Sequence, residues 1–160
     1  MKQHFLIILL FSTLSSIGQI DSSIASFIKS AERNIELPNN LANDSCYYSN
    51  TLLKISIDER CNVSSILLSD NAEDWLVNEL KRILNEKKLN VGTIEEYAKR
   101  KKLKSISLFM PVVIRSEWGV CRSRSIYWFN SRYYQFSGKF LNGNSLFLEP
   151  LEWILYEPVY

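Results

Sequence analysis

The sequence has 160 residues and a single histidine, His4, near its start. Histidine is the usual general base beside a serine or cysteine nucleophile, and it is a common zinc ligand. Because His4 lies in a predicted signal peptide (residues 1–18), the mature chain would have no Ser-His or Cys-His pair and no histidine ligand. This inventory excludes most hydrolase and zinc-site arrangements, and we expect no cofactor and no metal site.

The chain also has little net charge and a single long apolar run. A formal charge of +2 is too small to indicate nucleic-acid binding by itself. The run from Phe5 to Leu14 follows Lys2 and precedes Ser16-Ile17-Gly18, a small-x-small cleavage pattern. This order is typical of a signal peptide, and the run is shorter than the roughly 20 residues of a spanning helix. We expect an exported protein, periplasmic or secreted, with no integral membrane span in the mature chain; an uncleaved short anchor is the alternative.

Three strands are predicted from patterns of period two. Thr51–Asp58 has apolar residues at alternate positions, which is typical of a half-buried strand, and Val63–Ser69 follows after a turn. The apolar face of the first strand contains Leu53, Ile55 and Ile57. A third strand is predicted over Ile106–Arg115. Pro111 within it has no backbone donor, so this strand should lie at a sheet edge or at a bulge.

Three helices are predicted as well. The first covers Asp21–Asn34 and ends before Leu37-Pro38, because the residue before a proline leaves the helical region. The second begins near residue 70 or 71, where Asp70 and Glu73 form an Asp-x-x-Glu start signal. The capping box Thr93–Glu96 starts a third, short helix. The second helix has an apolar stripe, formed by Trp75, Leu76, Leu80, Ile83 and Leu84. Helices with one apolar stripe are expected to pack on the sheet.

A basic run, Lys99–Lys102, with Lys104 just beyond, has two interpretations. It could contact phosphates or anionic lipid headgroups. It could equally be a solvated helix end, where cations favour the helix dipole. We favour the solvated helix end, because no aromatic residue or glycine lies among the charges.

Residues 117–160 are rich in aromatic side chains, with three of the four tryptophans and five of the eight tyrosines. They predict a β extension that packs on the preceding domain and completes its core; a docking surface for carbohydrate, peptide or another subunit is the alternative. Three carboxylates lie near these aromatic residues: Glu149, Glu152 and Glu157. A carboxylate-based glycan-acting enzyme is therefore a further alternative. We predict no catalytic residues, because no nucleophile, base and orienting group can be named together.

The order of these elements resembles the C-terminal domain of TonB and related periplasmic proteins. Leu37-Pro38 precedes a strand pair, a helix and a last strand that reads Pro111-Val112-Val113-Ile114-Arg115. The likeness covers residues 20–116. It implies an α+β fold in which a small antiparallel sheet is packed by helices, with residues 19–116 as the TonB-like domain. The right-handed crossover rule then predicts the sheet order 2-1-3, with strand 3 antiparallel to strand 1.

The resemblance also implies a non-catalytic adaptor that binds an envelope protein or peptide segment by strand addition. The binding edge would be the exposed side of strand 106–115. Its residues would be Ser107, Phe109, Pro111, Val113 and Arg115. Alternatively, the aromatic extension pairs with this edge itself. The protein would then be a structural component of envelope assembly that uses the extension as its working surface.

The same topology makes a prediction about the three cysteines. Cys46 precedes strand 1 and Cys121 follows strand 3, so both lie at one end of the sheet, and Cys61 lies at the other. We therefore predict a Cys46–Cys121 disulfide in an oxidising compartment, with Cys61 as an inert thiol. The TonB-like hairpin usually has glycine where this chain has Cys61, so Cys61 or Asn62 should have a positive φ.

Overall fold

The computed structural model describes residues 21–43, 46–116, 131–141 and 143–156. The predicted signal peptide lies outside these residues. The helices and strands, in chain order, are α2 (Ser22–Asn34), η1 (Asn39–Asn43), β1 (Tyr48–Ile57), β2 (Val63–Leu68), α3 (Asp74–Asn85), α4 (Val91–Lys101), β3 (Ile106–Ser116), η2 (Ser131–Tyr134), β4 (Gln135–Phe136), β5 (Lys139–Phe140), β6 (Ser145–Phe147) and β7 (Leu151–Leu155).

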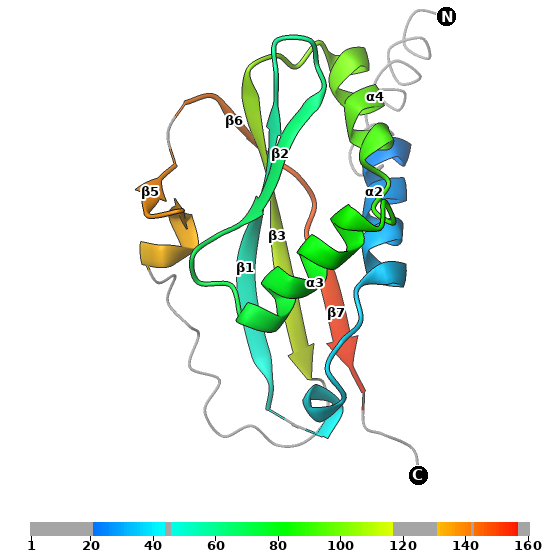
Figure 1. Cartoon of the computed structure of the whole chain (residues 1–160), viewed down its shortest axis with the longest axis vertical. Coiled ribbons are helices and arrows are strands. Elements are labelled where there is room, and N and C mark those ends of the chain that lie inside the picture. Colours follow the sequence, from blue (N-terminus) through cyan, green and yellow to red (C-terminus); the bar gives the residue numbers. More distant parts are fainter. Residues whose placement is uncertain (1–20, 44–45, 117–130, 142, 157–160) are drawn as a thin grey trace, which may run out of the picture.

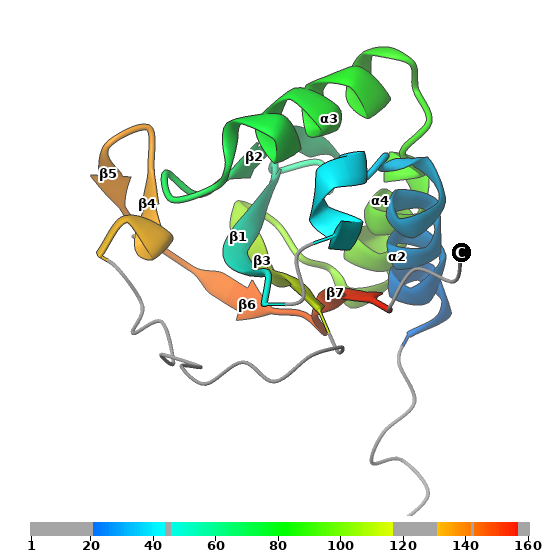
Figure 2. The same cartoon turned by 90° about the horizontal axis from the view of Figure 1, so that it is seen from below.

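These elements form an α+β fold in which α2, α3 and α4 lie on one face of a five-stranded sheet (Figures 1 and 2). The strand order is β2-β1-β3-β6, and β7 also pairs with β3. β1 is antiparallel to both β2 and β3, so the predicted order of the first three strands is confirmed. β6 and β7 are parallel to β3, so the prediction of an antiparallel sheet is wrong for the C-terminal strands. The long connection between residues 116 and 145 permits this, because parallel pairing needs a crossover of a dozen residues or more.

The main core lies between the helices and the sheet. Phe27 of α2, Ile83 of α3 and Ile94 of α4 are completely buried in one cluster with Ile55 and Leu108 of the sheet. The apolar stripe predicted for α3 is confirmed, since its buried residues are Leu76, Leu80 and Ile83. Each helix therefore buries an apolar face against the same side of the sheet.

α3 begins four residues later than the predicted start at Asp70, and its N-cap is Glu73. The carboxylate of Asp70 does not cap a helix. It accepts hydrogen bonds of 2.7 Å from the backbone N–H groups of Ser137 and Gly138, in the turn of the β4–β5 hairpin. Because this side chain is used in a tertiary contact, residues 70–73 remain a turn outside the helix.

The opposite face of the sheet carries a second, smaller cluster. Leu52 and Phe109 of the sheet are buried there with Tyr133 and Phe136. The rings of Phe109 and Phe136 lie 5.9 Å apart, and those of Phe109 and Phe147 lie 5.5 Å apart. From the described part of residues 117–160, Tyr133, Phe136 and Phe147 thus pack on the sheet.

The turn between β1 and β2 contains a cysteine in the left-handed region. Cys61 has φ of 63° and is a free, buried thiol. The carboxylate of Asp58 accepts the backbone N–H groups of Arg60 and Asn62, and the bond from Asn62 is the main reason that the pKa of Asp58 is low. Cys46 is disulfide-bonded. Cys121 lies outside the described residues, so the Cys46–Cys121 pairing stays a prediction.

The positive φ at residue 61 generates a stability prediction. Cys61→Gly should be more stable than Cys61→Ala by up to about 1 kcal/mol, because both variants lose the sulfur but alanine keeps the left-handed penalty. Urea unfolding of the two variants measures the difference. Ser56 lies inside β1, so the same two substitutions there should show the opposite order. A Cys61→Ala protein at least as stable as Cys61→Gly would contradict the strain.

Candidate partner-binding site

The five residues predicted to bind a partner occupy alternate positions of β3: Ser107, Phe109, Pro111, Val113 and Arg115. The N–H of Ser116 donates to the carbonyl of Tyr47, which precedes β1. Because antiparallel strands alternate their hydrogen-bonding residues, the backbone groups of these five residues point away from β1. They are the residues of β3 that face an additional strand.

That side of β3 is occupied by the chain itself. β6 pairs with residues 107–109 and β7 pairs with residues 112–116. The N–H of Ser107 donates to the carbonyl of Asn144, and the N–H of Leu148 donates to the carbonyl of Phe109. The expected exposed edge at β3 is therefore absent from the described structure, and the alternative arrangement, in which the C-terminal extension pairs with this edge, is the one observed.

The side chains of this predicted site are engaged as well. Phe109 is 1% exposed, beneath Phe136 and Phe147. Nε of Arg115 donates to Oε1 of Glu152 at 2.7 Å. Pro111 lies where β3 changes partner from β6 to β7, so its missing N–H faces the break between these two strands. Pro111 thus lies in a paired strand. It falls in the gap between the residues that pair with β6 and those that pair with β7, where the described pairing on this side of β3 is interrupted.

β2 forms the opposite edge of the sheet. No charged residue occurs from Asn62 to Ser69. The N–H of Ser69 donates to the carbonyl of Leu52, so alternation directs the backbone groups of Ile66 and Leu68 away from β1. Within the described residues, no hydrogen-bond partner is found for these outward N–H and C=O groups.

This edge is closed at both ends by the chain. The N–H of Val63 donates to Oε1 of Glu95 in α4 at 3.1 Å. The N–H of Asp70 donates to the carbonyl of Gln135 in β4 at 2.8 Å. Open backbone groups therefore remain between residues 64 and 68, and we call this stretch the β2 window.

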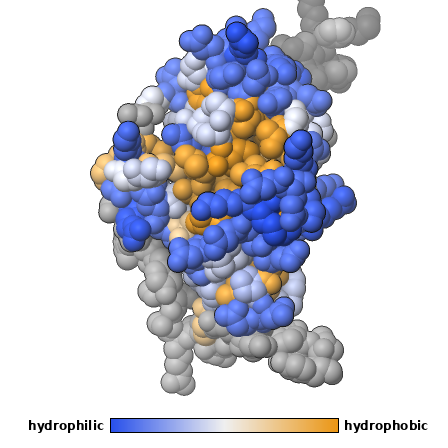
Figure 3. Space-filling view, in the orientation of Figure 1, coloured by the Kyte–Doolittle hydropathy of each residue, from blue (hydrophilic) through white to orange (hydrophobic). Residues whose placement is uncertain are grey.

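Apolar side chains surround the β2 window on both faces of the sheet. Figure 3 shows an apolar patch beside β2, between α3 and α4. Val63, Ile66 and Leu68 are half-buried on this helix-covered face, together with Leu84 of α3. Leu67 points to the other face and is 43% exposed. An extended chain laid along β2 would therefore contact apolar surface on both sides.

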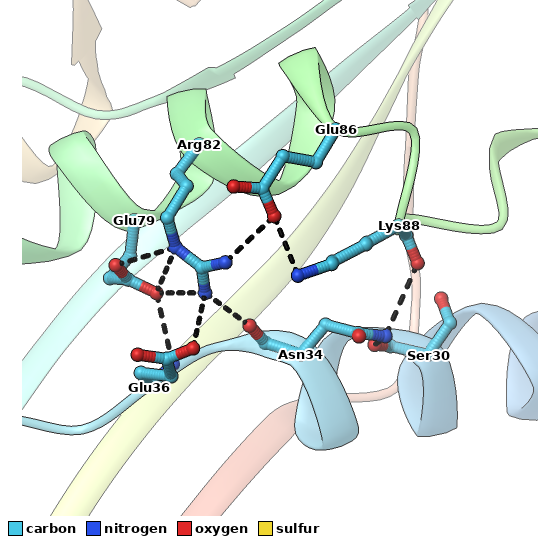
Figure 4. Close-up of polar contacts among 7 residues, drawn as sticks. All are labelled: Ser30, Asn34, Glu36, Glu79, Arg82, Glu86 and Lys88. Carbon is cyan, nitrogen blue, oxygen red and sulfur yellow. Dashed lines mark hydrogen bonds and ion pairs between the residues drawn. The ribbon is translucent and has the colours of Figure 1, made fainter.

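A polar network fixes α3 beside the patch (Figure 4). The guanidinium of Arg82 bonds to Glu79, to Glu86 and to the carbonyl oxygen of Asn34 at the end of α2, at 2.7 to 2.9 Å. It also forms an ion pair with Glu36 at 3.3 Å. The hydrogen bond from Arg82 lowers the pKa of Glu79, and the same contact raises the pKa of Arg82. The network joins α3 to the end of α2 and so holds one wall of the patch.

Among the described carboxylates before α3 and in the C-terminal extension, Asp70, Glu73 and Glu152 have structural partners. Asp70 holds the β4–β5 turn, and Glu152 pairs with Arg115. Glu73 accepts a 2.6 Å hydrogen bond from the Tyr47 hydroxyl and a 2.9 Å bond from Nε1 of Trp75. Asp74 and Glu149 are exposed, and Glu157 lies outside the described residues.

The basic run ends α4 and continues into its cap. Arg100 forms an ion pair with Asp21 at the start of α2, and Lys102 is the left-handed C-cap of α4. Cations at this position favour the helix dipole. These placements agree with the solvated helix end favoured from the sequence.

Comparison with protein-family models, curated proteins and solved structures finds no match to this chain. Among the described residues, no helix is long and apolar enough to cross a membrane. The sheet edges are therefore the features of the described structure that bear on function. Sequence reasoning missed the β2 window, although the uncharged run from Asn62 to Ser69 was a usable signal, because charged side chains commonly protect edge strands.

The Tyr47–Glu73 contact generates a pH prediction. Burial is the main cause that raises the pKa of Tyr47, followed by its hydrogen bond to Glu73 and the negative charge there. A raised folded-state pKa gives stability that is complete below the unfolded value, about 10, and is lost as the pH rises through the folded value. The free energy of unfolding should therefore fall above about pH 10 more steeply in the wild type than in Tyr47→Phe.

Urea unfolding at a series of pH values measures this slope. Tyr156→Phe is the matched control, because Tyr156 is 67% exposed. Equal slopes in the wild type and Tyr47→Phe would show that this hydroxyl does not couple folding to pH.

Proposed function

We propose that this chain is an exported, non-catalytic binding module that accepts an extended segment of an envelope protein along β2. The observation that carries the proposal is the β2 window, where outward backbone groups of Ile66 and Leu68 lie between apolar surfaces. Strand addition uses such groups for affinity and the neighbouring side-chain surfaces for specificity. The resemblance to the TonB C-terminal domain supports the mode of binding, with the edge moved from β3 to β2.

The short length of the β2 window favours binding of a single extended segment over pairing with β2 of a second copy of this chain. If β2 paired antiparallel with a second β2 about Leu67, Ser64 of the second copy would lie opposite Asp70. That position is taken by Gln135 of β4, which already accepts the N–H of Asp70. A single extended segment can end before this point. It would gain about four backbone hydrogen bonds, each contributing on the order of 1 kcal/mol.

A second candidate is a structural role in envelope assembly that uses the aromatic surface. Phe140 and Phe147 are 61% and 55% exposed, which is unusual for large apolar side chains. Phe147 also packs against Phe109, so its ring is held on the sheet. This candidate predicts that partners contact β5 and β6 and do not contact β2.

The proposed function is tested by photocrosslinking in the cell envelope from which the chain comes. A photoreactive residue replaces Leu67, and it is combined with Ile66→Pro or Ile66→Ala. Both substitutions remove the side chain, but proline also removes the outward N–H, which edge strands tolerate. We expect a discrete crosslinked partner with Ile66→Ala and a loss of most of that crosslink with Ile66→Pro.

Thermal melting of both variants verifies that each is folded. Equal crosslinking in the two folded variants would reject strand addition at β2. A partner captured from a photoreactive residue at Phe140, with no capture at Leu67, would favour the aromatic surface.

A further inference from the structure

The two carboxylates that border the β2 window are in different electrostatic situations. Asp70 uses both of its oxygens to accept backbone N–H groups, from Ser137 and Gly138. Glu95 accepts a single N–H, from Val63, through Oε1. No lysine or arginine among the described residues forms an ion pair with Glu95. One end of the window therefore presents a carboxylate without a cationic partner.

Glu95 lies on the path of a segment that follows β2. It is half-buried on α4, and it reaches the start of β2, three residues before Ile66. With a rise of about 3.3 Å per residue, this carboxylate lies about 10 Å along the strand from the centre of the open backbone groups. Consider a segment that pairs with Ile66 and Leu68. The residue of the segment that lies three or four positions beyond the one opposite Ile66, toward Val63, is then close to Glu95.

The chemistry of that partner residue follows from desolvation. An apolar residue would remove water from the carboxylate without replacing its hydrogen bonds, which is unfavourable. An acidic residue would add repulsion between like charges. A lysine or arginine supplies donors and opposite charge, and its long aliphatic stem can lie on the apolar patch.

We propose that the segment bound at β2 has an uncharged apolar core of about five residues followed by a cationic side chain that pairs with Glu95. This inference rests on the proposed strand addition at β2 and specifies the ligand of that site. The uncharged sequence from Asn62 to Ser69 selects the core, and the carboxylate of Glu95, which forms no ion pair with a described residue, selects the flanking charge. The charge fixes the register of the segment. Backbone hydrogen bonds alone cannot, because a shift of the segment by two residues gives the same backbone pairing.

The test uses two blocked synthetic peptides that share a five-residue core of alternating valine and threonine. One peptide has lysine at both ends and the other has glutamate at both ends, so the direction of the added strand does not affect the comparison. Binding to the full mature chain is measured by calorimetry at low salt. We expect the lysine peptide to bind about tenfold more tightly than the glutamate peptide, with a smaller difference at high salt.

Variants of α4 assign this preference to one carboxylate. Glu95→Gln keeps an oxygen acceptor for Val63 and should bring the two affinities to within about twofold. Glu95→Lys should reverse the preference. Glu96→Lys makes the same charge change at the next, exposed position of the same helix and should retain the preference for lysine.

The outcomes separate this inference from the proposed function. Equal binding of both peptides to the wild type, or a preference that persists in Glu95→Gln, would overturn the role of Glu95 and leave strand addition in place. Failure of both peptides to bind at concentrations up to the millimolar range would reject strand addition at β2, and the inference with it.

Discussion

A sheet has two edges, and in this protein the pairing of β3 with β6 and β7 decides which edge is open. The C-terminal strands align parallel to β3 and pair with its residues 107–109 and 112–116. An intramolecular strand competes strongly with any partner, because the covalent connection gives it a high effective concentration. The edge that looks most like a binding site in the sequence is therefore filled, and the opposite edge, at β2, carries backbone groups that have no partner within the described part of the chain.

Much of the central fold was predictable because its signals are local. The alternation of Leu53, Ile55 and Ile57 and the stripe of α3 each depend on a few neighbouring residues, and the structure has both. The order β2-β1-β3 followed from connection handedness, which is nearly invariant. The site prediction that followed from the resemblance named residues of β3 whose backbone groups point away from β1. It could not identify the strand that pairs with them, because β6 is three residues long and distant in sequence.

The remaining differences arise where a side chain has a tertiary role that local rules do not include. Asp70 and Glu73 match a helix start signal, yet they hold the β4–β5 turn and the Tyr47 hydroxyl, and α3 begins after both. The capping box Thr93–Glu96 predicts a helix start at residue 93, yet α4 begins at Val91, and the carboxylate of Glu95 within this motif accepts the N–H of Val63 at the start of β2. Local rules place these motifs at helix ends. In the structure, Asp70 and Glu95 lie at the two limits of the β2 window.

Those limits also explain how a free edge without charged residues can be tolerated. Long, regular edge strands pair with one another and aggregate, and proteins prevent this with short strands, bulges and covered ends. β2 has six residues, a bulge at Ser64 and a hydrogen-bonded cap at each end. A second sheet cannot follow it past Asp70, but a single extended segment of about five residues can lie between the caps. The features that protect the edge from self-association would thus also define the length of the segment that we propose for this site.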